Sequence, residues 1–387
     1  MAASSQSTQT KLALGETIKK TLTQRIFLDN DPRAATIDLL LGLLTFLAWS
    51  HDYILHGNAV SLSRFTQLAM TLVFDLRLNK PLPEHVNMLP IGSTAEHDSH
   101  LRHPSRTLEE RRAVLGCFVM SSIVSSYFAQ IDAMQWTPYM EECLEIVSRG
   151  KECSHDELFA YQVRLQRIAG EADEARSTPK VPPAFYISAL QHKVDEIKAR
   201  VSPQLQRDGT FLAHIFHTEL SICSLVLSKQ STPDLQRLEL LYTCLNTTRL
   251  ALDHFFEFPI AEYPGTSFPL FTQLARYIVV LYKLSTFKDP IWDTRLARST
   301  VDVVQVVDRL IGNILQAREA FGDESADGLL DKSIRIFKAF RSQCVANLDD
   351  GVGGDSEISG TERGARKDGS VPDPFLLDEM WFMDSFS

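Results

Sequence analysis

The chain lacks several patterns that would assign a function quickly. Lys and Arg number 39 against 49 Asp and Glu, so the formal net charge is -10 and no excess of positive charge exists. A protein that binds duplex DNA needs clustered cations to displace counterions from the phosphates. We therefore expect no direct nucleic-acid contact from this chain. Closely spaced cysteines are also missing; the six are Cys117, Cys143, Cys153, Cys223, Cys244 and Cys344.

Long hydrophobic runs are scarce. The most apolar window, Ile37–Trp49, is shorter than the roughly 20 residues of a membrane span and contains Asp38. It predicts a buried helix, and we expect no membrane association. The N-terminus is polar, without the apolar segment of a secretory signal, and Glu16 argues against a transit peptide. Cysteines inside apolar helical patterns are usually small buried residues with free thiols. Their positions here therefore fit a reducing compartment, the cytosol or nucleus.

Catalytic motifs are absent from the sequence. There is no G-x-S-x-G nucleophile elbow and no P-loop. Asp349 and Asp350 resemble the start of an acidic Mg²⁺ motif, but three glycines separate them from Asp355, so no helix aligns the carboxylates. The sequence therefore predicts no catalytic residue, no cofactor and no enzyme.

Two histidine groups are candidate metal ligands. His97, His100 and His103 are three residues apart, which on a helix brings them towards one face. They lie in a polar segment, so solvated histidines are the simpler interpretation. His214 and His217 stand among apolar residues and are predicted to be a hydrogen-bonded pair in the core. We expect no bound metal.

Helical periodicity covers most of the chain. Thr107 and Glu110 form a capping box before the apolar run 113–120. The charged stretch Glu109–Arg112 is either an anchor for an anion or adjacent chain, or simply the first turn of that helix. Further helices are indicated by apolar spacing in the ranges 61–79, 187–201, 270–282 and 303–315. Strand-like alternation is hard to find, so the predicted fold class is all-α, with ten or more helices.

The sequence divides into four parts. Residues 1–9 are predicted to be disordered, and residues 10–347 to form the helical domain, with a polar excursion at 81–106. Residues 348–374 are rich in Gly and acidic side chains and predict a flexible linker with a flexible acidic tail beyond it. Its stretch 363–367 is a very weak basic patch.

The tail 375–387 mixes carboxylates with bulky apolar side chains. Such segments are typical of transcriptional activation regions, because Asp378, Glu379 and Asp384 keep the apolar groups solvated until a partner's groove accepts them. Alternatively, the tail folds back as a terminal helix and covers the core, since the linker is long enough. The predicted partner-binding residues are Phe375, Leu376, Leu377, Trp381, Phe382 and Phe386.

Three segments resemble the regulatory domain of fungal zinc-cluster transcription factors, the fungal-specific transcription factor domain. The first, Phe65–Pro81, is similar to a helix that ends in an Asp-Leu-Gly-Leu turn, but Arg77 stands where glycine is usual. In the second, Arg106–Ser125, a Glu and paired Arg precede a buried helix, with Val114 and Leu115 replacing the usual aromatic pair. The third is Trp136–Val147, which resembles the stretch that follows that helix.

The resemblance implies a nuclear regulator of transcription, often of metabolic or secondary-metabolite genes, that forms a homodimer or heterodimer. It does not extend to the family's DNA-binding module, since no C-x-x-C-x₆-C pattern occurs here. The predicted partners are the transcription machinery or a DNA-binding protein. Two alternatives remain: a ligand-binding or adaptor module acting through a DNA-binding partner, or a product truncated of an upstream zinc cluster.

Overall fold

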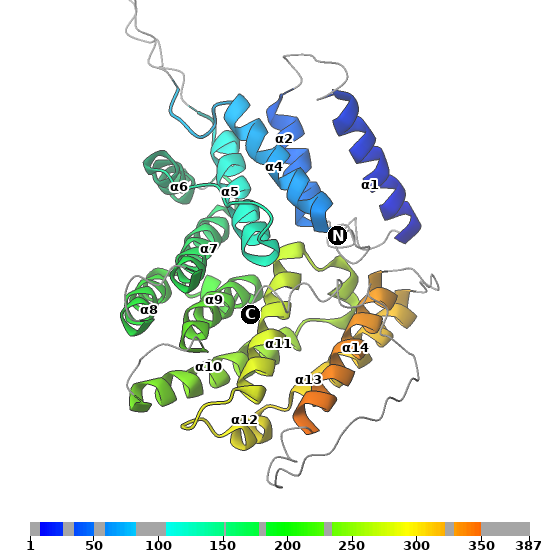
Figure 1. The fold of residues 1–387 in the computed structure, drawn as a ribbon. Coiled ribbons are helices and arrows are strands. Elements are labelled where there is room, and N and C mark those ends of the chain that lie inside the picture. Colours follow the sequence, from blue (N-terminus) through cyan, green and yellow to red (C-terminus); the bar gives the residue numbers. More distant parts are fainter. Residues whose placement is uncertain are drawn as a thin grey trace, which may run out of the picture.

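The computed structural model describes residues 8–25, 35–49, 59–82, 106–150, 152–177, 183–227, 234–321 and 329–349 (Figure 1). Within those ranges the chain forms thirteen α-helices and no strand, so the all-α prediction is confirmed. The helices are α1 (Thr8–Thr23), α2 (Ile37–Ala48), α4 (Ala59–Asp75), α5 (Leu108–Phe128), α6 (Pro138–Gly150), α7 (Asp156–Ser177), α8 (Pro183–Arg200), α9 (Gly209–Cys223), α10 (Asp234–Phe255), α11 (Phe268–Thr286), α12 (Thr294–Thr300), α13 (Val303–Phe321) and α14 (Leu329–Asp349). Three 3₁₀ turns complete them: η2 (Leu205–Arg207), η3 (Ser224–Leu227) and η4 (Ile260–Gly265).

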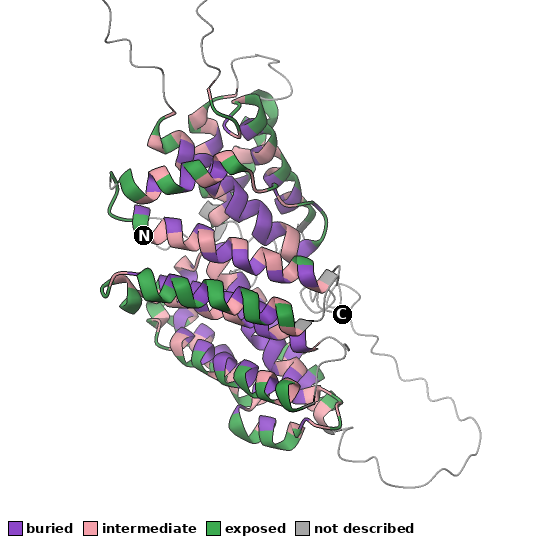
Figure 2. Cartoon of the chain, turned by 90° about the vertical axis from the view of Figure 1, so that its left-hand side faces the viewer, coloured by how far each residue is buried: buried purple, intermediate pink, exposed green. Residues whose placement is uncertain are grey.

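Helix α5 is the centre of the N-terminal half. As its uninterrupted apolar run predicts, nearly every residue from Ala113 to Phe128 is buried, which is why Figure 2 colours this region purple. Thr107 and Glu110 form the predicted capping box at its start. Around α5 pack α2, α4, α6 and the beginning of α7. The segment 37–49 forms the predicted helix, but only its face with Leu40, Leu43 and Leu47 is buried, and Trp49 at its end is exposed.

Helix α4 ends in a left-handed turn. Arg77 has φ 54°, the amide of Arg77 donates to the carbonyl of Phe74, and the amide of Leu78 donates to the carbonyl of Val73. These are the two hydrogen bonds of a Schellman motif, whose left-handed position normally holds glycine. The guanidinium of Arg106 donates to the Arg77 carbonyl at 2.7 Å and so ties the turn to the start of α5.

Two further layers complete the molecule below α5 in Figure 1. Helices α7, α8 and α9 share one apolar cluster, and α9 to α14 share the largest one. Among the described helices, the stretch Gly209–Leu227 is long and apolar enough to cross a membrane by length and composition, but 67% of its apolar window is buried inside the structure. A core helix of a soluble protein passes the same test.

Several predicted features lie outside the described residues. They include residues 1–7, most of the polar excursion at 81–106 with its three histidines, and everything after Asp349, the tail included. Helix α1 begins at Thr8, two residues before the predicted start of the domain. All six cysteines are described, and none forms a disulfide; five are buried and Cys153 is exposed.

Candidate functional site

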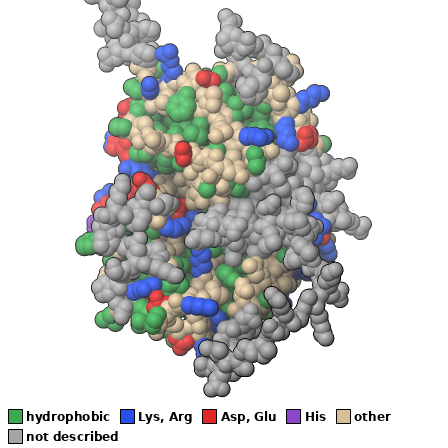
Figure 3. Space-filling view, viewed as in Figure 1, with side chains coloured by type: hydrophobic (Ala, Val, Ile, Leu, Met, Phe, Trp, Pro, Cys, Tyr) green, Lys and Arg blue, Asp and Glu red, His purple; other side chains and the backbone are tan. Residues whose placement is uncertain are grey.

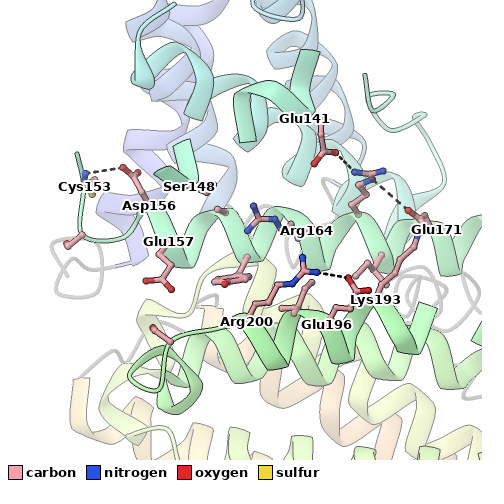
Figure 4. A pocket seen from close by; sticks show the side chains of 17 residues that line it. Glu141, Ser148, Cys153, Asp156, Glu157, Arg164, Glu171, Lys193, Glu196 and Arg200 are labelled. Atoms are coloured by element: carbon pink, nitrogen blue, oxygen red, sulfur yellow. Dashed lines mark hydrogen bonds and ion pairs between the residues drawn. The ribbon is translucent and has the colours of Figure 1, made fainter. Parts of the chain in front are cut away.

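A trough of about 1000 Å³ crosses the surface at α6, α7 and α8 (Figure 4). Helix α7 provides its floor, while α6 and α8 flank it on either side. The lining mixes charged side chains from all three helices with apolar groups such as Tyr161, Ile168 and Ile197. We call this feature the α6–α8 trough.

One end of the trough is built by the turn before α7. Asp156 accepts hydrogen bonds from the Arg112 guanidinium at 2.7 and 2.8 Å and from the Cys153 amide at 3.0 Å. Hydrogen bonds from Arg112 therefore hold the pKa of the Asp156 carboxyl below its ordinary value, against the opposing effect of burial. Arg112 also pairs with Glu152 at 2.8 Å, so α5 fixes both sides of the turn.

The α6 side is positioned by the Trp136 segment. The indole of Trp136 packs edge-on against Phe118 of α5 and donates to the Glu141 carboxylate at 3.0 Å. That carboxylate also pairs with Arg167 of α7 at 2.5 Å, and the Arg167 guanidinium lies 5.0 Å from the centre of the Trp136 ring. Residues of Trp136–Val147, the third segment that resembles the family, therefore hold α6 against α5 and α7.

The α8 side carries two further ion pairs. Lys193 reaches across to Glu171 of α7 at 2.5 Å, and Arg200 pairs with Glu196 one turn back at 3.4 Å. Behind them the predicted apolar stripe of α8 is buried against α7 and α9, as the 3–4 spacing indicated. These pairs are exposed and contribute little stability, but they neutralise the charges along this side.

Arg164 differs from the other cations of the trough. It projects from the middle of the α7 floor, and its guanidinium lies 5.4 Å from the centre of the Tyr161 ring (Figure 4). Within the part of the chain that the structure describes, it makes no ion pair. The trough therefore presents one uncommitted guanidinium beside an aromatic ring.

The opposite face of α7 contributes to a partly buried charge cluster. Arg276 of α11 is only 1% exposed and pairs with Asp173 at 3.4 Å, and Arg176 binds the same carboxylate at 2.7 Å. Ser126 of α5 donates to it as well. Burial alone would raise the pKa of the Asp173 carboxyl, but the two guanidiniums hold it below its ordinary value. The cluster joins α5, α7 and α11.

His214 and His217 lie beside this cluster on α9. Gln273 bonds to Nδ1 of His214 at 3.1 Å, which suits a neutral imidazole with its proton on Nε2. Burial lowers the pKa of His214 to about 4. Burial and then the charge of Arg276 also lower the pKa of His217, well below its ordinary value. The prediction of a hydrogen-bonded core pair is right for His214 and wrong for His217, whose Nδ1 is buried with no hydrogen-bond partner among the described residues.

The charged stretch Glu109–Arg112 forms the first turn of α5 and also contacts neighbouring segments of the chain. Arg111 is buried, 3.5 Å from the Cys143 sulfur and 3.8 Å from Glu142 of α6, and Arg112 binds Asp156 and Glu152. The stretch anchors neighbouring helices of the same chain, because the side chains reach residues 31 to 44 positions away.

A second, apolar pocket of about 50 Å³ lies among α11, α13 and α14. Its lining is almost entirely aromatic and aliphatic, with Thr266 and Ser333 as the polar members. A cavity of this volume has room for only a few water-sized groups. No group of three His, Cys, Asp or Glu side chains that could hold a metal ion occurs among the described residues.

Sequence comparison with known proteins identifies relatives of this chain. The chain is 31% identical to the transcription factor opdL of Penicillium oxalicum over 369 residues, 90% of this chain and 64% of that protein. A transcription factor of Aspergillus terreus is 29% identical over 79% of the chain and 47% of its own length. The chain is homologous to fungal transcription factors. A further such factor, himD of Aspergillus japonicus, is 24% identical over 69% of the chain.

The similarity covers only part of each relative's length, and the matching family profile covers only part of this chain. The chain spans 64%, 47% and 46% of the lengths of these three transcription factors. The sequence profile of the ATEG07667_C family, described as a C-terminal domain, matches residues 260–387. No solved structure matches the chain. The predicted resemblance to fungal transcription factors is confirmed by these homologues.

Proposed function

We propose that the chain regulates transcription in a fungal nucleus. The observation that carries this proposal is the likeness to opdL, which extends over 90% of the chain. The regulated genes are a metabolic or secondary-metabolite set, as the resemblance of residues 65–81, 106–125 and 136–147 implies. A non-enzymatic role is part of the proposal.

In this role DNA contact comes from elsewhere, either from a partner protein or from sequence outside these residues. The net charge of -10 supports this division. On the face shown in Figure 3, the described Lys and Arg side chains are dispersed among acidic and apolar ones, unlike the clustered cations of a phosphate-binding surface. Mapping the 5′ end of the transcript, and searching the preceding reading frame for closely spaced cysteines, separates the two sources.

The recruiting element in this proposal is the tail with its six apolar anchors, Phe375 to Phe386, which lies outside the described residues. The support is the sequence alone: Asp378, Glu379 and Asp384 are interleaved with aromatic side chains. A partner's apolar groove would accept the aromatics and leave the carboxylates at its rim.

A reporter assay tests this function. The full chain, and separately residues 349–387, are fused to an unrelated DNA-binding domain. We expect both fusions to activate a reporter, and the double variant Trp381→Ala/Phe382→Ala to lose most of that activity. The matched control, Ser356→Ala/Ser359→Ala in the preceding segment, keeps it. Two silent fusions, or activation that persists without the two aromatics, would contradict recruitment by the tail.

A ligand-binding module that acts only through a DNA-binding partner is the second candidate, and the α6–α8 trough favours it because it offers a cavity of about 1000 Å³ on the helical domain. Co-purification with a DNA-binding protein, combined with silent fusions in the reporter assay, would support this candidate over the first.

A further inference from the structure

We infer that the α6–α8 trough binds a small organic monocarboxylate with a planar apolar body. The inference begins from Arg164. Its guanidinium is the cation of the trough that no carboxylate neutralises within the described part of the chain. The guanidinium lies over the Tyr161 ring, and its N–H groups are the donors that a carboxylate would bind.

The remaining charges of the trough are committed. Arg167 pairs with Glu141, Lys193 with Glu171, and Arg200 with Glu196. Asp156 is held by Arg112 from behind the trough. Glu157 is exposed in the first turn of α7, where the partial positive charge of a helix N-terminus favours a carboxylate.

This distribution specifies the charge of the ligand. One carboxylate can bind the two edges of the Arg164 fork in the bidentate geometry that guanidinium groups favour. A second carboxylate on the same ligand would meet side chains that are already paired, or the negative charge of Glu157. A monocarboxylate therefore fits the trough better than a dicarboxylate does.

The apolar lining specifies the body of the ligand. Tyr161 is the half-exposed apolar group of the floor, and the buried Ala160, Ile168 and Ile197 lie beneath the surface of the trough. A planar aromatic or alicyclic body can lie against the Tyr161 ring. The volume of about 1000 Å³ lies at the upper end of the range for small-molecule sites, so a one- or two-ring body has room.

The site does not depend on the proposed role in transcription, because it is read from the geometry of the helical domain alone. If both hold, the ligand supplies a signal to the regulator. Helix α7 carries the trough residues on one face and Asp173 of the partly buried cluster on the other.

Calorimetric titration of the purified full chain with 2-naphthoate tests the inference. We expect saturable binding with one site per chain. The amide 2-naphthamide, which has the same shape without the charge, should bind at least tenfold more weakly, about 1.4 kcal/mol. Naphthalene-2,6-dicarboxylate should also bind more weakly than 2-naphthoate.

Two variants locate the site. Arg164→Gln should weaken 2-naphthoate at least tenfold, while Arg64→Gln, which changes an exposed arginine on α4, should leave its affinity unchanged. If Arg164→Gln unfolds the chain, Tyr161→Leu replaces it and should weaken 2-naphthoate several-fold. Absence of 2-naphthoate binding at millimolar concentration, equal affinity for acid and amide, or affinity untouched by the trough variants would each overturn the inference. None of these binding results changes the outcome expected in the reporter assay. The ligand site and the role in transcription can therefore be contradicted independently of each other.

Discussion

Two residues have unusual properties that lead to testable predictions: Arg77 has a left-handed backbone conformation, and His214 has a lowered pKa. Arg77 occupies the left-handed position of the Schellman turn after α4, where the family resemblance places glycine. The Cβ of an L-residue costs about 1–2 kcal/mol in that conformation. Its side chain is exposed and the hydrogen bonds of the turn come from the backbone, so the arginine offers no compensating contact among the described residues.

We expect Arg77→Gly to stabilise the protein by about 0.5–1 kcal/mol, because relief of the strained φ exceeds the extra entropy that glycine adds to the unfolded chain. Urea unfolding measures the change. Arg64→Gly, in the regular part of α4, is the control and should destabilise by roughly 1 kcal/mol. A loss of stability in Arg77→Gly would show that the arginine side chain contributes to the native state.

His214 predicts a pH dependence at the same scale. Its folded pKa of about 4 lies below the value of about 6.5 in the unfolded chain. The unfolded state therefore binds more protons between these values, and stability falls as the pH drops from 6.5 towards 4. This single histidine contributes a slope of up to about 1.4 kcal/mol per pH unit, and His217 adds to it in the same direction.

The variant His214→Gln should flatten that slope when the free energy of unfolding is measured by urea titration at several pH values. His192, 76% exposed on α8, provides the matched control His192→Gln, which should leave the slope as it is. An unchanged slope in the His214 variant would mean that this imidazole is not neutral in the folded protein.

Among the elements, α5 depends on its first turn. Thr107 accepts from the Glu110 amide at 3.1 Å, and the Glu110 carboxylate accepts from the Thr107 amide at 2.8 Å. Thr107→Ala should therefore cost about 1 kcal/mol in the free energy of unfolding, while Thr107→Ser should cost much less because the hydroxyl remains. Equal losses in the two variants would show that the threonine methyl group, not the cap, is what matters.

Local patterns explain which elements sequence reasoning finds. The capping box and the stripe of α8 involve residues three or four positions apart, so their geometry follows from the helix itself. Asp173 and Arg276 are 103 positions apart, and no local rule pairs them. A signal did exist, since Arg276 interrupts the apolar run of α11 between Leu274 and Tyr277. The trough was missed because it needs three helices to be placed together.

At the scale of the whole molecule, the Asp173 cluster joins helices of the upper and lower halves. Asp173→Ala should cost about 3 kcal/mol, because it leaves Arg176 and Arg276 without their shared carboxylate in a poorly hydrated site. Arg276→Met should cost less, since Asp173 keeps Arg176 and Ser126 as partners. Thermal unfolding by calorimetry measures both, and the reverse order of the two losses would contradict this account of the cluster.

Cys153 gives the molecule a natural labelling point. The other five thiols are buried, and burial raises the pKa of Cys117 and of Cys344 to about 12, which leaves them unreactive towards alkylating dyes. Cys153 is exposed at the end of the α6–α8 trough. A maleimide fluorophore added to the unmodified protein should attach there alone, so that occupancy of the trough becomes visible as a change in emission without any engineered cysteine.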